Sequence, residues 1–442
     1  MNFDESLAYL HSLGHETLAI NFDLNHTARL LEALGQPQQN FLKVQIAGTN
    51  GKGSTASMLE AITRAAGIKT ALYTSPHLVN ITERMRFNGP EISRADFALM
   101  ATGVREAAAR LVQTGALSKL PTIFEHLTVM FLCACAGERV EIAILETGLG
   151  GRLDATTAAR AEVAAVTPVA FDHQEYLGHT LASIAAEKAA IIHPEATIVL
   201  APQEREAMEV MLSECAKFSI TPRMAECEAL ILGADERGRL RVTFRTCQNV
   251  YEAVRLSLPG RHQIVNASVA IAISEALNDE RGLRISREAV VEGLESAEHA
   301  GRLEWQDGEP SFLFDGAHNA QGARALRVYL DEFVDGPVTL IFGAMRDKDL
   351  ELMAAQLFPA AERLILTVMD NARSATRDTL AQLASQQTAD VQFTLASDVR
   401  AAIDLAVKQT PPEGIICVTG SLNLIGEVKA ALCRAPDEIY AN

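Results

Sequence analysis

The chain has 442 residues, too many for one ordinary hydrophobic core at ~150 residues per domain, so two or three domains are expected. Its formal net charge of −17 argues against nucleic acid as the main partner, although a local loop can still bind an anion. Without a leader-like N-terminus, a long apolar segment or a C-x-x-C pair among seven cysteines, the sequence predicts a cytoplasmic protein without a membrane partner.

Strands and helices are predicted to alternate through the first 297 residues. A rhythm of this kind is typical of a mostly parallel sheet with helices on both faces. The segment 239–258 breaks the rhythm and predicts two paired antiparallel strands. The buried-type strands are expected at 41–48, 69–75, 140–148, 162–173 and 196–202, and the helices at 54–67, 93–112 and 122–137.

A second, smaller α/β domain is predicted for residues 298–442, with the boundary at 297/298. Short apolar strands again alternate with helical patterns, which indicates a Rossmann-like unit. Strands are expected at 312–316, 338–343, 363–368 and 414–420, and helices at 319–333, 349–358, 375–387, 398–409 and 424–434.

The strongest local signal is the segment Gly48-Thr49-Asn50-Gly51-Lys52-Gly53-Ser54, between a predicted strand and a predicted helix. Glycines let backbone N–H groups face an anion, a lysine can reach β- and γ-phosphates, and a serine can offer its hydroxyl to Mg²⁺. The spacing departs from the general P-loop because Gly53, rather than Ser or Thr, follows Lys52. A glycine-rich turn that merely caps a helix is the disfavoured alternative.

Polar residues at other predicted strand ends form a second candidate group. Glu146 ends one strand and could be a Mg²⁺ ligand or a solvated strand end. Asp172 and His173 are taken to end the next strand, and Ser75 lies in another loop of the same kind. From the residues alone, His173 is interpreted as an acid/base or positioning group, and Lys188 as an exposed helical lysine.

Together these pieces resemble the Mur ligase superfamily, and more closely its bifunctional dihydrofolate synthase/folylpolyglutamate synthase branch. Motifs in the family order cover nearly the whole chain. The sequence departs from the family pattern at residues 23–26, at Thr157 and at Ala320. The matching segments are GTNGKGS (48–54), SPHL (75–78), LETGLGGRLDAT (145–156), FDHQEYLG (171–178), EKAAII (187–192), LPGRHQIVNA (258–267), GRLE (301–304), DGAHN (315–319) and TGSLNLIGE (419–427).

The resemblance implies roles for individual residues. ATP phosphates would be held at Gly51, Lys52, Gly53 and Ser54, and the nucleotide also at Asn266, Arg302 and Asp315. Two Mg²⁺ ions are implied, with ligands among Ser54, Ser75, Glu146 and His173. Lys188 matches a lysine that is carbamylated in the family. The pterin end of the substrate would lie at Thr122, Ile123, Phe124 and Glu125, with Leu153, Asp154 and Ala155 as weaker candidates. His318 is a candidate for orienting phosphate or glutamate, and loop capping is its alternative role.

The implied reaction is ATP-dependent ligation of L-glutamate to dihydropteroate and to the γ-carboxylate of reduced folates through an acyl phosphate. The partners would be these small molecules, and the protein would be a monomer. Three alternatives stay open: a folylpolyglutamate synthase without the dihydropteroate step, a P-loop regulatory module without ligase activity, and a cell-wall Mur-type ligase. The cell-wall ligase is disfavoured by Gly53 and by the segment PTIFEHLT (121–128), which resembles the pterin-binding segment of the folate enzymes.

Overall fold

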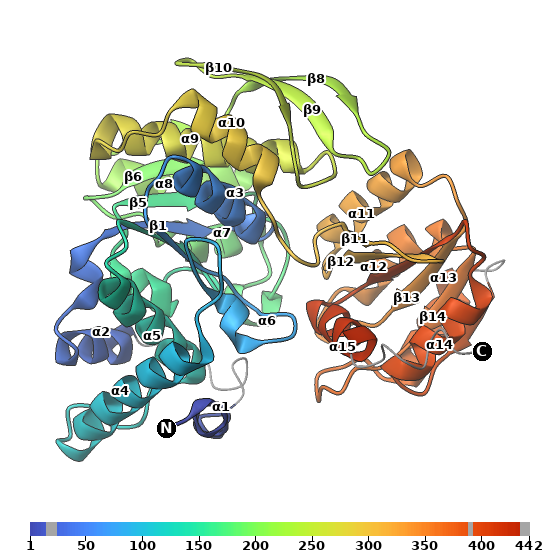
Figure 1. The fold of residues 1–442 in the computed structure, drawn as a ribbon, viewed down its shortest axis with the longest axis horizontal. Helices are drawn as coiled ribbons and strands as arrows, with labels where there is room; N and C mark the ends of the chain where they lie inside the picture. The colour runs from blue at the N-terminus through green and yellow to red at the C-terminus, as the bar shows by residue number, and fades with distance from the viewer. Residues whose placement is uncertain (15–23, 388–391, 434–442) are drawn as a thin grey trace.

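The computed structural model describes residues 1–14, 24–387 and 392–433 and shows two α/β units side by side (Figure 1). The N-terminal unit carries strands β1 to β10, and the C-terminal unit carries strands β11 to β16. The predicted fold class, two mostly parallel sheets covered by helices, is confirmed. The domain boundary at 297/298 stays a prediction, and Asp23 of the divergent segment 23–26 lies outside the described residues.

The large sheet of the N-terminal unit has the strand order β3-β2-β4-β1-β5-β6-β7, and all neighbours are parallel except β2 and β3. The prediction of a strand through 162–173 is wrong in its second half, since β5 ends at Val166. Pro168 follows closely and has no N–H to donate to a neighbouring strand. The strands are β1 Leu42–Ala47, β2 Thr70–Tyr73, β3 Met85–Phe87, β4 Ile142–Glu146, β5 Val163–Val166, β6 Thr197–Leu200 and β7 Arg223–Met224.

Both faces of this sheet are buried because successive side chains of a strand point to opposite sides. In β4, Ile142 and Ile144 pack into a core with α3, α9 and α10, whereas Ala143 and Leu145 pack with α4 and α5. The helices are α1 Phe3–Ser12, α2 Leu24–Ala33, α3 Lys52–Ala65, α4 Arg94–Gln113, α5 Ile123–Glu138, α6 Gln174–Leu177, α7 Leu181–Ala189, α8 Arg205–Lys217, α9 Gln263–Arg281 and α10 Arg287–Ser296.

A separate antiparallel sheet of three strands lies over α9 and α10 (Figure 1). The predicted pairing within 239–258 is confirmed by β9 Leu240–Arg245 and β10 Val250–Arg255. The sequence prediction lacks the third strand, β8 Glu228–Ala234, which pairs with β9 and leaves most of its residues exposed.

The C-terminal unit is built on a six-stranded sheet in the order β11-β12-β16-β13-β14-β15, in which only β11 runs antiparallel. Helices α11, α12 and α13 cover one face, and α14 and α15 cover the other. The strands are β11 Glu304–Gln306, β12 Ser311–Asp315, β13 Val338–Phe342, β14 Arg363–Leu366, β15 Phe393–Leu395 and β16 Ile415–Thr419; the helices are α11 Ala320–Phe333, α12 Leu350–Leu357, α13 Arg377–Gln387, α14 Val399–Gln409 and α15 Leu422–Cys433.

Within the described residues, no helix combines the length and apolar character that crossing a membrane requires.

Candidate active site

The glycine-rich loop connects β1 to α3, as predicted. β1 ends at Ala47, and α3 begins at Lys52, so the backbone N–H groups at the helix start face the loop. Gly51 has a φ of 88°, and a Cβ there would lie 2.1 Å from the side-chain oxygen of Asn266. Only glycine therefore fits this position, where the loop meets α9.

Lys52 is partly buried, and its ammonium group donates a hydrogen bond to the carbonyl oxygen of Thr49 at 3.1 Å. Burial lowers the pKa of Lys52, and the negative charges of Glu146 and Asp172 oppose that shift. An anionic ligand in the loop would offer this ammonium a stronger acceptor than the Thr49 carbonyl.

The glycine that departs from the general P-loop is explained by His299, which the sequence analysis missed. A Cβ on Gly53 would lie 2.3 Å from the Cε1 atom of His299, so the imidazole occupies the space of a side chain. Nδ1 of the same ring lies 3.4 Å from the hydroxyl of Ser54. Burial, and then the charge of Arg302, lowers the pKa of His299 to about 3, so the ring is neutral.

This contact predicts a specific effect of Gly53→Ala. Overpacking at such a position costs ~1–3 kcal/mol, and we expect nucleotide affinity to fall about tenfold, the equivalent of about 1.4 kcal/mol. Titration with a fluorescent nucleotide measures it. The double variant Gly53→Ala/His299→Ala should recover affinity because the clashing ring is removed. Gly103→Ala is the matched control, since nothing lies within 4 Å of a Cβ there. Unchanged affinity in Gly53→Ala would contradict the explanation.

Glu146 lies at the carboxyl end of β4, beside the glycine-rich loop. Its carboxylate accepts a hydrogen bond from the backbone N–H of Ser75 at 3.1 Å. Burial raises the pKa of Glu146, whereas the charge of Lys52 lowers it. The buried carboxylate of Glu146 lines the same cavity as Ser54 and Ser75, and a carboxylate with two serine hydroxyls is a donor set that Mg²⁺ accepts.

His173 lies in the loop after β5 rather than at a strand end. Its φ of 51° is left-handed, an uncommon conformation for a residue other than glycine and one that is often found at functional sites. Burial lowers the pKa of His173 to about 3, so the imidazole is neutral. Its Nδ1 atom is buried and finds no hydrogen-bond partner among the residues that the structure describes. An unpaired nitrogen of this kind fits a metal ligand.

The described residues contain no cluster of three or more His, Cys, Asp or Glu side chains that could hold a metal ion by themselves. A Mg²⁺ ion at Glu146 and His173 would therefore also depend on serine hydroxyls, water and phosphate oxygens. That arrangement is usual for Mg²⁺, which keeps several waters and takes few protein ligands.

Lys188 on α7 is buried, with 4% of its surface exposed, so its interpretation as an exposed helical lysine is wrong. The helix turns this residue toward the loop, and its ammonium group donates to the carbonyl oxygen of Gly48 at 2.9 Å. Burial, and then the nearby charge of Lys52, lowers the pKa of Lys188 to about 7. In a large fraction of the protein molecules the Lys188 amine is therefore neutral and nucleophilic near neutral pH.

The residues predicted to hold the pterin end use several of their polar groups for local structure. Thr122 and Glu125 form a capping box at the start of α5, and Asp154 accepts hydrogen bonds from the backbone of Leu149 and Thr156. The ring of Phe124 reaches over the chain at Gly148, where a Cβ would lie 2.5 Å from it. Phe124 is the aromatic residue among these candidates, so its side chain is the one that can stack on a ring system.

The C-terminal unit contributes Asp315, the last residue of β12, and His318, which follows the strand. The carboxylate of Asp315 accepts hydrogen bonds from the backbone N–H groups of Leu303 and Ala317, and burial raises its pKa. Nδ1 of His318 lies 2.8 Å from the carbonyl oxygen of Gly316, in agreement with the loop-capping alternative. Its Nε2 lies 3.4 Å from Asp172 of the N-terminal unit.

One cavity of about 990 Å³ brings these residues together. It extends from the glycine-rich loop to the start of α5 and across to the C-terminal unit. Its lining also includes Arg84, Lys348 and Arg373, which no local sequence pattern indicated. Every residue predicted for the site lines the cavity: Gly51, Lys52, Gly53, Ser54, Ser75, Thr122, Ile123, Phe124, Glu125, Glu146, Leu153, Asp154, Ala155, His173, Lys188, Asn266, Arg302, Asp315 and His318.

Two protein-family models match the chain. The Mur ligase middle domain matches residues 46–274, and the Mur ligase glutamate ligase domain matches residues 301–422.

Curated relatives match over almost the whole chain. A dihydrofolate synthase/folylpolyglutamate synthase of Bacillus subtilis is 30% identical over 97% of this chain and 99% of its own length. A probable bifunctional folylpolyglutamate synthase/dihydropteroate synthase of Haloferax volcanii is 32% identical over 95% of this chain. The match spans only 51% of the length of that relative.

Solved structures share the fold. Mycobacterium tuberculosis folylpolyglutamate synthase complexed with ADP is 30% identical and superimposes with a TM-score of 0.90, covering 98% of this chain and 99% of its own. Escherichia coli FolC in complex with DHPP and ADP is 28% identical, with a TM-score of 0.85 and 98% of both chains covered.

Proposed function

The chain belongs to the Mur ligase family, and on this premise we propose that it is a bifunctional dihydrofolate synthase/folylpolyglutamate synthase. It ligates L-glutamate to dihydropteroate and to the γ-carboxylate of reduced folates, with ATP converted to ADP and phosphate. The observation that carries the proposal is that one cavity joins the glycine-rich loop, Phe124 at the start of α5 and the C-terminal unit. The relatives with both activities in their names support the same function.

Amide formation from a free carboxylate needs an activated leaving group. Transfer of the γ-phosphoryl group to the substrate carboxylate gives an acyl phosphate, and the glutamate amine then displaces phosphate at its carbonyl carbon. Lys52 and the N–H groups at the start of α3 neutralise and position the transferring phosphoryl group. Asn266, Arg302 and Asp315 hold the nucleotide, and His318 orients phosphate or glutamate.

We assign Ser54, Ser75, Glu146 and His173 as the metal-binding residues. Mg²⁺ bound there would supply positive charge against the phosphate oxygens. The unpaired Nδ1 of His173 and the buried carboxylate of Glu146 support this assignment. Lys188 is proposed to carry a carbamate, since about half of its amine is neutral at a pH near its pKa of about 7 and it faces the same loop. A monomeric state and a cytoplasmic location stay predictions.

The function is tested by ADP release from the purified protein with Mg-ATP and L-glutamate. Three reactions are compared: with dihydropteroate, with tetrahydrofolate and with neither. Release that depends on each pterin substrate establishes the bifunctional enzyme. Release with tetrahydrofolate alone identifies a folylpolyglutamate synthase without the first activity. Slow hydrolysis that neither substrate changes would overturn the ligase proposal in favour of a regulatory ATP-binding protein.

Phe124→Ala separates the pterin end from the nucleotide end. Loss of a stacked aromatic ring is expected to cost ~1–1.5 kcal/mol, so the KM for dihydropteroate should rise about tenfold. The KM for ATP should stay constant because the ring packs on the chain at Gly148 and against Tyr73, which are not part of the glycine-rich loop. Steady-state kinetics with each substrate varied in turn provides the measurement. Phe218→Ala, at an exposed ring outside the cavity, is the matched control; equal changes in both KM values would argue for a general distortion instead.

A further inference from the structure

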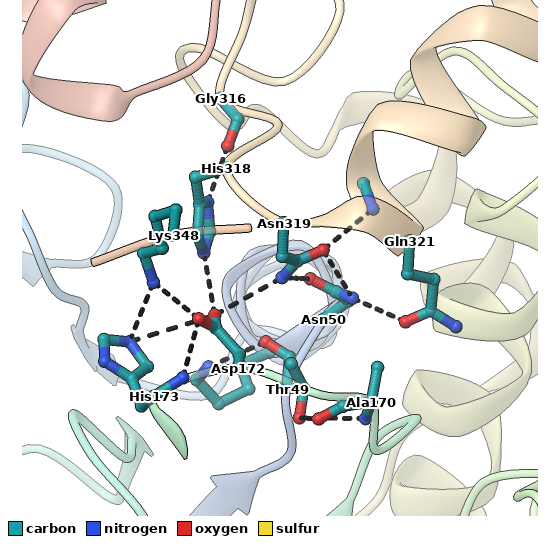
Figure 2. Close-up of polar contacts among 12 residues, drawn as sticks. Thr49, Asn50, Ala170, Asp172, His173, Gly316, His318, Asn319, Gln321 and Lys348 are labelled. Carbon is teal, nitrogen blue, oxygen red and sulfur yellow. Dashed lines mark hydrogen bonds and ion pairs between the residues drawn. The ribbon is translucent and has the colours of Figure 1, made fainter. Parts of the chain in front are cut away.

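Asp172 lies where the two units of the protein meet, at the edge of the cavity. It follows β5 of the N-terminal unit, and its carboxylate is surrounded by donors from the C-terminal unit (Figure 2). Although it is charged, its side chain is only 6% exposed. Burying a carboxylate is costly unless its oxygens are well hydrogen-bonded, so this placement calls for an explanation.

Both oxygens of Asp172 are fully engaged. Oδ1 accepts the ammonium of Lys348 at 2.5 Å and the backbone N–H of His173 at 2.9 Å. Oδ2 accepts the amide of Asn319 at 3.3 Å and lies 3.4 Å from Nε2 of His318. Three of these four partners come from the C-terminal unit, so separating the units would remove them together.

The partners come from the carboxyl ends of the strands of the second sheet. His318 and Asn319 follow β12, and Lys348 follows β13. Asn319 is also the N-cap of α11, where its side-chain oxygen accepts the N–H of Gly322 at 2.9 Å. Its position is therefore fixed by the helix rather than by a flexible loop.

The contacts around Asp172 continue to the glycine-rich loop. The amide of Asn319 also donates to Asn50 at 3.0 Å, and Asn50 donates to Gln321 at 2.5 Å. Thr49 exchanges two 3.0 Å hydrogen bonds with the backbone of Ala170, two residues before Asp172. Figure 2 shows the contacts of Asp172, Asn319 and Asn50 as one connected set, with the contacts between Thr49 and Ala170 beside it.

We propose that Asp172 and Lys348 are positioning residues that couple closure of the C-terminal unit to assembly of the phosphate and metal site. A buried ion pair adds little net stability, but a partner left alone is strongly disfavoured, so such a pair selects one relative arrangement of the units. Asp172 also holds the backbone of His173. The inference rests on the proposed ligase function, for which neither residue is otherwise assigned a role.

The test compares Lys348→Met, Asp172→Asn and the double variant in the full-length protein. We expect kcat for ligation to fall on the order of a hundredfold in Lys348→Met, since small displacements of reacting groups have such effects. Nucleotide affinity, measured with a fluorescent analogue, should fall as well, because the proposed nucleotide contacts of Arg302 and Asp315 come with the C-terminal unit. Small-angle scattering with a non-hydrolysable ATP analogue should give a larger radius of gyration than in the wild type. Because both residues act as one unit, the double variant should be no slower than Lys348→Met.

Asp307→Asn is the matched control, since Asp307 forms an exposed ion pair with Arg237 across the same two units. An exposed pair contributes little, so kcat and the radius of gyration should not change. If Lys348→Met fails to fold, Asn50→Ala weakens the same set of contacts between the two units at a partly exposed residue. This variant should also increase the radius of gyration.

Wild-type kcat and compactness in Lys348→Met, or additive effects in the double variant, would overturn the proposal. If the wild type ligates glutamate to no pterin substrate, the proposed function fails separately. The scattering and nucleotide-binding measurements still decide the coupling in that case.

Discussion

Lys52→Ala is expected to reduce substrate-dependent ADP formation by about 10²–10³-fold, the loss typical when one charged or hydrogen-bonding group that stabilises a transition state is removed. The structure places this ammonium at the start of α3, within the same cavity as Glu146 and Asp172. Within the described part of the chain it donates to the carbonyl oxygen of Thr49, a neutral acceptor that a phosphate oxygen can replace. A coupled assay for ADP measures the effect.

The fold should survive this change. Burial disfavours the charged form of Lys52, so removing the amine relieves part of that cost. Thermal unfolding of Lys52→Ala should therefore stay close to that of the wild type. Lys119→Ala, at an exposed lysine, is the control for loss of a positive charge. Activity in Lys52→Ala within a few-fold of wild type would exclude the assigned role.

Activity is also expected to depend on dissolved CO₂ through Lys188. A neutral amine attacks CO₂, forms an N–C bond and releases one proton, which leaves an anionic carbamate. With the pKa lowered to about 7, the neutral fraction of Lys188 rises as the pH increases through 7, whereas an unperturbed lysine would stay almost wholly charged. Depletion of CO₂ should lower kcat, and bicarbonate should restore it, with a steeper response above pH 7 than below. Incorporation of ¹³C-bicarbonate, followed by NMR, detects the adduct directly.

Lys188→Met is expected to lower activity on the order of 10–100-fold, as for other groups that support a metal site from outside its ligands, and to remove the response to bicarbonate.

The same substitution should increase the free energy of unfolding at neutral pH. The wild-type amine has a lower pKa in the folded state than in the unfolded state, so its cost to stability is complete below pH 7. That cost is lost as the pH rises toward 10.5. Lys188→Met should therefore be the more stable protein at neutral pH. A bicarbonate response that persists in Lys188→Met would place the carbamate elsewhere.

Local patterns in the sequence were sufficient for the glycine-rich loop and for most of the parallel strands. A strand, three glycines, a lysine and a helix start are neighbours in the chain, so Gly48 to Ser54 could be interpreted without knowing the fold. The buried strands of both sheets appear as apolar runs because both of their faces are covered. Short or edge strands such as β7, β8 and β15 lack that signature, and the prediction missed them.

The sequence by itself therefore determined the kind of chemistry and the residue types available for it. Only the tertiary structure decided that Lys188 is buried, that His299 occupies the space beside Gly53, and that Lys348 meets Asp172. Each of these facts depends on residues more than a hundred positions apart. A local pattern describes how a segment distributes its own apolar and polar groups, but burial and pKa depend on which distant segments pack against it.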